Sequence, residues 1–327
     1  MARVSTHTRE VRLARRPHGE PVLDDFELAA RELDDPGEGR LLVRNVVMSV
    51  DPYMRGRMDD RKSYVAPFEI GRPLAGAAVG EVVGTGELVV HPKGWREHAV
   101  VREEQVSRPA LPSGMPASVL LGALGMPGMT AWVGLTEVAR VAAGETVFVS
   151  AAAGAVGSVA GQLARARGCR VIGSAGGPEK VAFVLEELGF DACFDHRADD
   201  PRSALAEGID VYFDNVGGPQ LEAAVGALRR GGRIALCGAV SQYNAVSPAP
   251  GPRNLGLLVG KRGVMRGFIV GDHAAREDEF RAEVGELLAS GRLKRPETVV
   301  EDGLEAAPQA FIDMLRGKHL GKVVVAL

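Results

Sequence analysis

Cysteine is scarce in this chain. The 327 residues contain three cysteines, Cys169, Cys193 and Cys237, which stand far apart. A disulfide framework and a structural zinc knuckle both need closely grouped cysteines, so the sequence indicates neither. All three lie in apolar, strand-like segments, where a small buried thiol is the ordinary interpretation.

The chain also lacks an excess of charge and a long apolar run. Its formal net charge is −3, which argues against a broad basic field for nucleic acid or anionic lipid. No apolar run reaches the length of a membrane span, and no apolar core follows the first basic residues as in a signal peptide. We therefore expect a cytoplasmic protein that acts on a small molecule, with no nucleic-acid or membrane partner.

The composition is that of a globular protein, and the length predicts two domains. Apolar residues make up 46% and charged residues 25% of the 327, a chain too long for one ordinary core. Residues 1–120 are β-rich, with short valine-rich runs between glycines and prolines. Residues 121–295 alternate helices with short apolar strands, which is typical of βαβ units. Residues 296–327 turn β-like again and are expected to complete the first domain.

The second region predicts an α/β fold with a Rossmann-type, doubly wound parallel sheet inserted into the β-rich domain. Six strands are expected between helices. They are Thr146–Ala151, Arg170–Ser174, Ala192–Asp195, Ile209–Asp214, Arg233–Cys237 and Val264–Val270.

The strongest local pattern is a glycine-containing turn after the first of these strands. The strand leads into Ala152-x-Gly154-x-x-Gly157 and then into an apolar helix. Gly154 lets the backbone approach a pyrophosphate, Gly157 permits close packing of helix on strand, and the helix N-terminus offers amides to phosphates. Alanine at the first position departs from the common pattern, but the flanking strand and helix are those that a dinucleotide site requires.

The end of the next strand indicates which dinucleotide is bound. Sheets that bind NAD usually carry an acid there, on the ribose diol. Here the strand continues through Ser174 into Ala-Gly-Gly-Pro without an acid, and Lys180 follows in the next helix. A lysine can pair with a 2′-phosphate, so NADPH (or NADP) is favoured; a solvated helix lysine is the alternative.

Several segments in this order resemble the zinc-independent medium-chain dehydrogenases/reductases. The most similar subgroup is that of the prostaglandin reductases and the double-bond reductases of plants and bacteria. The resemblance implies a GroES-like catalytic domain, an inserted Rossmann domain, NADPH between them, and a homodimer. The segments that carry it are Met48–Met58, Gly125–Ala131, Ala152–Gly157, Phe213–Gly218 and Cys237–Asn244.

The resemblance also assigns residues. Tyr243 is expected near the nicotinamide ribose, where it either anchors the cofactor or assists protonation. Tyr53 and Tyr64 are expected around the substrate, with packed tyrosines as the alternative. The remaining cofactor residues are Ala152, Gly154, Ala155, Val156, Gly157, Ser174, Lys180, Asn215, Gly217, Cys237 and Gly238.

Three positions depart from the family pattern. His196 stands where the family has a tyrosine near the adenosine phosphate, and Arg197 follows it. His319 replaces an asparagine that helps to position the cofactor, and is either a substitute donor or a surface histidine. Trp132 replaces a tyrosine and is expected to narrow the substrate pocket.

A metal-free reaction follows from the residues that are missing. Zinc alcohol dehydrogenases need cysteine and histidine ligands in the catalytic domain, and no cysteine precedes Cys169. Hydride transfer without a metal needs an electron-poor acceptor, such as an alkene conjugated to a carbonyl. We expect hydride to reach the β-carbon, and Tyr243 or the ribose hydroxyl to donate a hydrogen bond to the oxygen. Water or a tyrosine then protonates the α-carbon.

Three alternatives remain open at this point. Quinone reduction uses the same fold and cofactor, and oxidation of a secondary alcohol is the reverse type of reaction. A dinucleotide-binding protein without turnover is the third, since a fold alone does not prove activity.

Overall fold

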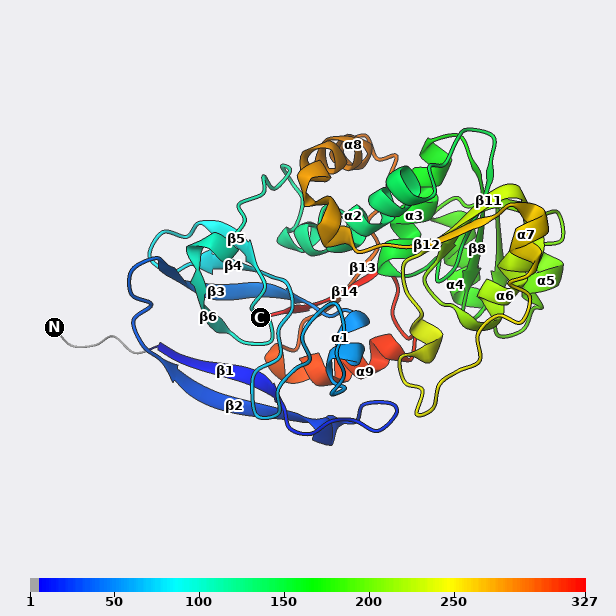
Figure 1. Ribbon diagram of the computed structural model, residues 1–327. Helices are drawn as coiled ribbons and strands as arrows, with labels where there is room; N and C mark the ends of the chain where they lie inside the picture. Colours follow the sequence, from blue (N-terminus) through cyan, green and yellow to red (C-terminus); the bar gives the residue numbers. More distant parts are fainter. Residues whose placement is uncertain (1–5) are drawn as a thin grey trace. The chain divides into compact units, whose positions relative to one another are not determined.

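A computed structural model describes residues 6–327 of the protein (Figure 1). The described chain divides into two compact units: unit 1 holds 6–121, Glu297–His319 and Val323–Leu327, and unit 2 holds Gly122–Pro296 and Leu320–Lys322. The main breaks stand next to the boundaries expected after residues 120 and 295. Leu320–Lys322 group with unit 2 because the Gly321 amide donates to the Ala153 carbonyl at 2.8 Å.

Unit 2 contains a six-stranded parallel sheet with the order β12-β11-β10-β7-β8-β9. This order reverses at β7, so the doubly wound arrangement expected from the sequence is confirmed. The strands are β7 (Thr146–Val149), β8 (Arg170–Ala175), β9 (Ala192–Asp195), β10 (Ile209–Asp214), β11 (Leu228–Leu236) and β12 (Val264–Gly267).

Helices connect these strands and pack on one another. α2 contacts both α3 and α8, and α5 contacts α6. The helices are α2 (Met126–Val133), α3 (Ala155–Ala166), α4 (Pro178–Glu186), α5 (Pro201–Ala204), α6 (Gly218–Ala227), α7 (Leu257–Lys261) and α8 (Glu277–Ala289).

Two predicted boundaries were wrong. The strand expected over Val264–Val270 ends at Gly267, where its pairing with Leu236 at the end of β11 also ends. β11 begins at Leu228 rather than Arg233, with an irregular register against β10 between Ile209 and Val211. Tertiary pairing decided both limits, because a strand extends only as far as its neighbour does.

Unit 1 is built mainly from antiparallel strands. β1 (Thr6–Leu13) and β2 (Phe26–Leu33) form a hairpin that the sequence did not predict. Charged residues interrupt its apolar pattern, and Glu10 is buried because Arg12 donates to its carboxylate at 2.9 Å. A second sheet has the order β13-β14-β3-β4-β5, and β6 also pairs with β3.

The second sheet includes the strands at the end of the chain, since β14 pairs antiparallel with β3. Its core joins both parts of the sequence and includes Met48, Met54, Trp95 and Phe311. The elements are β3 (Arg40–Ser49), α1 (Tyr53–Arg57), β4 (Ala78–Val82), β5 (Leu88–His91), β6 (His98–Arg102), β13 (Glu297–Val300), α9 (Ala307–Leu315) and β14 (Lys322–Ala326).

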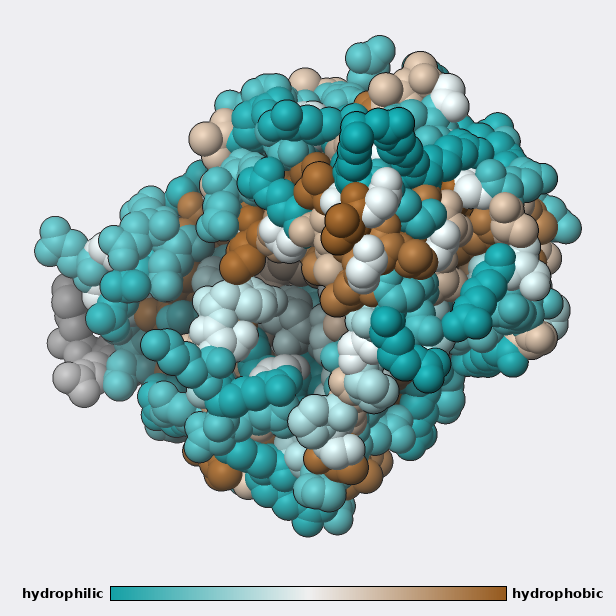
Figure 2. Space-filling model, turned by 45° about the vertical axis from the view of Figure 1, so that its right-hand side comes forward, coloured by the Kyte–Doolittle hydropathy of each residue, from teal (hydrophilic) through white to brown (hydrophobic). Residues whose placement is uncertain are grey.

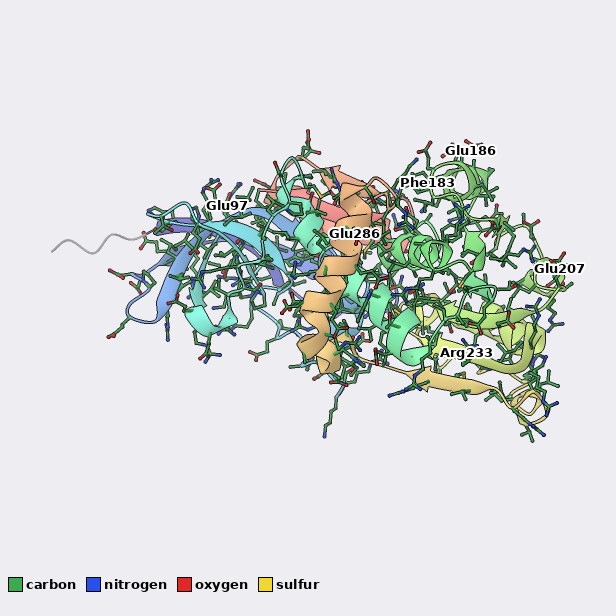
Figure 3. The ribbon with its side chains drawn as sticks, turned by 90° about the horizontal axis from the view of Figure 1, so that it is seen from above. Glu97, Phe183, Glu186, Glu207, Arg233 and Glu286 are labelled. Carbon is green, nitrogen blue, oxygen red and sulfur yellow. The ribbon has the colours of Figure 1, made fainter. Side chains whose placement is uncertain are left out.

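The two ends of the unit 2 strands are built differently. Ion pairs gather at the amino ends, where Arg233 contacts Glu145 at 2.7 Å and Arg170 contacts Glu207 at 2.6 Å. Figure 3 labels Arg233 and Glu207 among the side chains of unit 2. The turns at the carboxyl ends consist of glycine, alanine and buried polar groups instead. Ligands of doubly wound sheets bind at the carboxyl ends, so this edge is the candidate site. In residues 6–327 no helix has the length and apolar character of a membrane span.

Candidate cofactor-binding site

The first turn of the site joins β7 to α3 and is made by small residues. Ala151 adopts φ 50° and Gly154 precedes the first residue of α3 with φ −90°. A Cβ on Gly157 would lie 2.2 Å from the Ala151 carbonyl oxygen, so only glycine permits this approach of helix to strand. The structure places the predicted strand before this turn and the predicted helix after it, with Gly157 at the point of close packing. The binding of a pyrophosphate by the turn stays a prediction. The amides at the start of α3, at Ala155 and Val156, form the N-terminus that phosphates favour.

Backbone hydrogen bonds hold this turn from two sides. The Ala152 amide donates to the Ser174 carbonyl at 2.9 Å, and the Gly321 amide donates to the Ala153 carbonyl at 2.8 Å. The Ser174 hydroxyl itself is buried and donates to Gln220 at 2.6 Å. The direct cofactor contact expected of Ser174 stays a prediction.

Three cationic or titratable groups surround the glycines after β8. Lys180 lies on α4, and a Cβ on Gly176 would lie 3.0 Å from both Arg197 Nε and His196 Nε2. Burial and the charge of Arg197 lower the pKa of Lys180 and of His196. Such a cluster destabilises itself in the free protein, and an anion placed among these groups would relieve the repulsion.

One acid also lies near this cluster. Asp195 ends β9, and its Oδ1 accepts hydrogen bonds from the amides of Gly177 at 2.9 Å and Arg197 at 3.0 Å. These amides lower the pKa of the carboxyl and occupy the same oxygen. Asp195 thus orients the loop that carries His196 and Arg197. The residues fit a 2′-phosphate, since β8 itself ends without an acid.

The second turn joins β10 to α6. Gly217 has φ 73° and Gly218 has φ 56°, a backbone region that favours glycine. Asn215 is buried, and its side-chain amide donates to the Ser150 carbonyl at 2.7 Å. The turn therefore lies beside the end of β7, where the first turn begins.

The end of β11 is folded back on this second turn. The Cys237 and Gly238 amides donate to the Asp214 carbonyl at 2.8 and 3.0 Å, and the Val240 amide donates to the Asn215 carbonyl at 3.1 Å. Burial and the charge of Asp214 raise the pKa of the Cys237 thiol to about 12, so it is not a nucleophile at neutral pH. A Cβ on Gly238 would lie 3.3 Å from the Tyr243 hydroxyl. Asn215, Gly217, Gly238 and Tyr243 are thus brought together.

Trp132 is engaged in helix packing. Its side chain on α2 is 2% exposed, its indole N–H donates to Glu283 on α8 at 2.6 Å, and its ring packs against Phe280. Arg276 lies over the ring at 4.9 Å from the centroid. These contacts account for the burial of the indole, and its role in a substrate pocket stays a prediction.

The predicted substrate tyrosines and His319 belong to unit 1. Tyr53 begins α1, and burial together with the charge of Asp51 raises the pKa of its hydroxyl well above the ordinary value, so the hydroxyl stays protonated. Tyr64 is 68% exposed on a loop. His319 precedes β14 and lies near Asp313, whose pKa it helps to lower. Their predicted roles stay predictions.

Sequence reasoning missed three polar residues under the second turn. Ser150, Tyr212 and Asp214 are each 0% exposed and hydrogen-bonded to one another. Tyr212 and Asp214 stand two residues apart on a strand, so their side chains share one face. A tyrosine and an acid alternating within an apolar strand were the available signal. Among residues 6–327, no group of three or more His, Cys, Asp or Glu is placed to hold a metal ion.

Comparisons with known proteins place both regions. Residues 9–108 match the family described as "N-terminal domain of oxidoreductase", and residues 155–290 match the family described as "Zinc-binding dehydrogenase". The chain is 42% identical to the NADPH-dependent curcumin reductase of Escherichia coli (strain K12), over 96% of this chain and 95% of that one. It is 38% identical to prostaglandin reductase 1 of Bos taurus, over 94% and 95%.

A solved structure gives the same result. CurA from Vibrio vulnificus, crystallised in complex with NADPH, matches with a TM-score of 0.92 and 42% identity. The match covers 97% of this chain and 98% of CurA.

Proposed function

Because this chain belongs to the zinc-independent medium-chain reductases of the prostaglandin reductase type, we propose that it reduces a carbon–carbon double bond conjugated to a carbonyl, with NADPH as hydride donor. The observation that carries the proposal is the convergence of three features at one edge of the unit 2 sheet. These are the backbone-built phosphate turn, the cluster of Lys180, His196 and Arg197, and the Tyr243 hydroxyl.

The cofactor assignment follows from charge. The amides of α3 bind the pyrophosphate, and Asn215 with Gly217 lines the nicotinamide half. Lys180, His196 and Arg197 bind the 2′-phosphate, which NADH lacks. A hydrogen bond to a charged group contributes about 1.5–3 kcal/mol. This enzyme therefore prefers NADPH to NADH.

When bound, NADPH supplies a hydride to the β-carbon of the substrate. The protein orients the acceptor and stabilises the negative charge that moves to the carbonyl oxygen. Tyr243 donates a hydrogen bond to that oxygen and keeps its proton, and water or a tyrosine then supplies the one proton that the α-carbon gains. Tyr53 and Tyr64 are proposed as further residues that contact the substrate.

A panel of acceptors tests the function. Loss of NADPH absorbance is followed with enones, enals, quinones and secondary alcohols, the last with NADP in the reverse direction. We expect enones and enals to react fastest. Faster turnover of quinones or alcohols would reassign the reaction, and no turnover with any of them would leave a dinucleotide-binding protein.

Tyr243→Phe tests the role of the hydroxyl. A donor aimed at developing charge contributes about 2–3 kcal/mol, so kcat and kcat/KM should fall together by roughly 30- to 150-fold. Affinity for NADPH should change little. A rise in the NADPH dissociation constant with unchanged turnover at saturation would make Tyr243 a cofactor anchor only.

Catalysis without zinc is part of the proposal, because no cysteine precedes Cys169 and the acceptor is already electron-poor. Dialysis against a strong chelator should leave the full rate. An activity that is lost on dialysis and restored by zinc would refute this point.

The homodimer is proposed at the free edge of the unit 2 sheet. β12 is the terminal strand in the sheet order, and its first residue, Val264, is 53% exposed, while Ile269, two residues after its end, is 39% exposed. Figure 2 shows hydrophobic side chains gathered on the face of unit 2 that carries β12. An apolar edge strand pairs readily with a second copy. Sedimentation should give a dimer, and Val264→Lys should give a monomer; a monomeric wild type at micromolar concentration would exclude it.

The cellular location follows from the same features as the chemistry. Free cysteines and an NADPH-dependent reaction suit a reducing compartment, so we place the protein in the cytoplasm. Fractionation of the source cells with an antibody against the protein tests this placement.

A further inference from the structure

A cluster of buried polar groups lies below the second turn, where apolar side chains would pack without cost. Tyr212 Oη donates to Asp214 Oδ1 at 2.6 Å and lies 3.0 Å from Ser150 Oγ. All three side chains are 0% exposed. Burying a carboxylate, a phenol and a hydroxyl is unfavourable unless hydrogen bonds offset the free energy lost when water is removed from them.

One carboxylate oxygen organises the backbone of the turn. Asp214 Oδ1 accepts hydrogen bonds from the amides of Val216 at 2.9 Å and Gly217 at 2.8 Å, in addition to the Tyr212 hydroxyl. Its other oxygen, Oδ2, is buried and has no hydrogen-bond partner among the described residues. Burial raises the pKa of this carboxyl, and the Tyr212 hydroxyl and the two amides act against that rise.

The Asn215–Gly217 turn also supports the segment that carries Tyr243. The Val240 amide donates to the Asn215 carbonyl at 3.1 Å. The Ser241 hydroxyl donates to the Val216 carbonyl at 2.6 Å. A shift of the turn would therefore be passed to Tyr243, two residues after Ser241.

We propose that Asp214 is a positioning residue of this reductase, and that Tyr212 holds its carboxylate in place. Neither group contacts substrate or cofactor. Asp214 sets the Asn215–Gly217 turn, and through it both the nicotinamide side of the cofactor site and the Tyr243 hydroxyl. The inference rests on the function proposed above, which assigns Asn215, Gly217 and Tyr243 their roles.

Tyr212→Phe removes the hydroxyl and keeps the ring. The ring stacks on Phe148 with centroids 4.6 Å apart and planes 9° from parallel, and phenylalanine preserves this stack. We expect amide hydrogen exchange at Val216 and Gly217 to accelerate about 10-fold in the protein without cofactor. The NADPH dissociation constant, measured by fluorescence titration, should rise by roughly the same factor.

Phe148→Leu is the matched control. It disrupts the same stack but removes no hydrogen bond of the network. It should lower the melting temperature while leaving the NADPH dissociation constant and the exchange at Val216 and Gly217 unchanged. If Phe148→Leu raises the dissociation constant as much as Tyr212→Phe does, the network is merely structural and the proposal is wrong.

A double-mutant cycle tests the link to Tyr243. Asp214→Asn should lower kcat about 10-fold when Tyr243 is present, and much less in a Tyr243→Phe background, because the positioned group is then missing. Additive effects would overturn the proposal. If Asp214→Asn does not fold, Tyr212→Phe takes its place in the cycle. If the wild type reduces no enone, the proposed function fails, and exchange and NADPH binding still decide whether Asp214 sets the turn.

Discussion

The two turns at the carboxyl edge of the unit 2 sheet are held in their conformations by different interactions. The turn after β7 consists of alanine and glycine, and its geometry comes from backbone hydrogen bonds and from the close approach at Gly157. The turn after β10 is held by a side chain, because four donors converge on Asp214 Oδ1: the hydroxyls of Tyr212 and Ser150 and the amides of Val216 and Gly217.

The difference matches what each turn is proposed to hold. A pyrophosphate needs amides and room, which small residues provide. The second turn must instead hold another loop, the segment from Val240 to Tyr243, in a fixed position. A buried network provides that rigidity through several hydrogen bonds, each of which contributes a part, whereas the glycine turn has no room for one added carbon atom.

The largest effect on stability and NADPH binding is expected when one methyl group is added to the first turn. In Gly157→Ala the new Cβ would lie 2.2 Å from the Ala151 carbonyl oxygen, so α3 must move away from the end of β7. We expect a loss of about 3 kcal/mol in the free energy of unfolding. NADPH should bind roughly 100-fold more weakly.

Gly285→Ala on α8 is the control, since a Cβ there meets nothing within 4 Å. It should leave both quantities unchanged or raise stability slightly. Normal NADPH affinity in Gly157→Ala would show that the turn tolerates displacement. Chemical denaturation and fluorescence titration give the two measurements.

Removing a positive charge that lies outside both turns should have the next largest effect on NADPH binding. Lys180→Ala removes one cation from the cluster with His196 and Arg197, and should raise the KM for NADPH roughly 10- to 100-fold. The KM for NADH should barely change, because NADH has no 2′-phosphate. A wild type that prefers NADH would contradict the assignment of the cluster.

The second turn should weaken gradually as hydrogen bonds are removed. Ser150→Ala deletes the oxygen that accepts from the Asn215 amide at 2.9 Å. One neutral hydrogen bond contributes about 1 kcal/mol, so the NADPH dissociation constant should rise about 5-fold. An effect as large as that of Gly157→Ala would mean that both turns are equally sensitive to a single substitution.

The smallest expected effect is a change in how NADPH affinity depends on pH. Burial and Arg197 lower the pKa of His196, so the imidazole is neutral at pH 7 in the free protein. A bound 2′-phosphate favours the protonated form. NADPH affinity should therefore rise as the pH falls from about 7.5 to 5.5, by roughly 3-fold relative to His196→Gln. The phosphate titrates near pH 6 in both proteins, so parallel profiles would exclude a role for His196.

Much of the fold could be predicted because its signals are local. Apolar strands followed by glycine and a helix indicate the parallel sheet and the turn at Gly154, whatever surrounds them. The β1–β2 hairpin was missed, since Glu10 is buried in it and no apolar alternation marks the strands. The end of β12 was also misplaced, because its length depends on β11.

The sequence by itself determined the alternation of strands and helices in residues 121–295, the glycine-containing turn after β7, and the absence of an acid after β8. The physical reason is that backbone geometry near glycine and the hydrophobic period act within a few residues. Only the tertiary structure decided that Ser150, Tyr212 and Asp214 form one network, and that His196 and Arg197 lie beside the glycines before Lys180. Those contacts join residues up to 64 positions apart, and hydrogen bonds at that separation form only once the parallel strands pair.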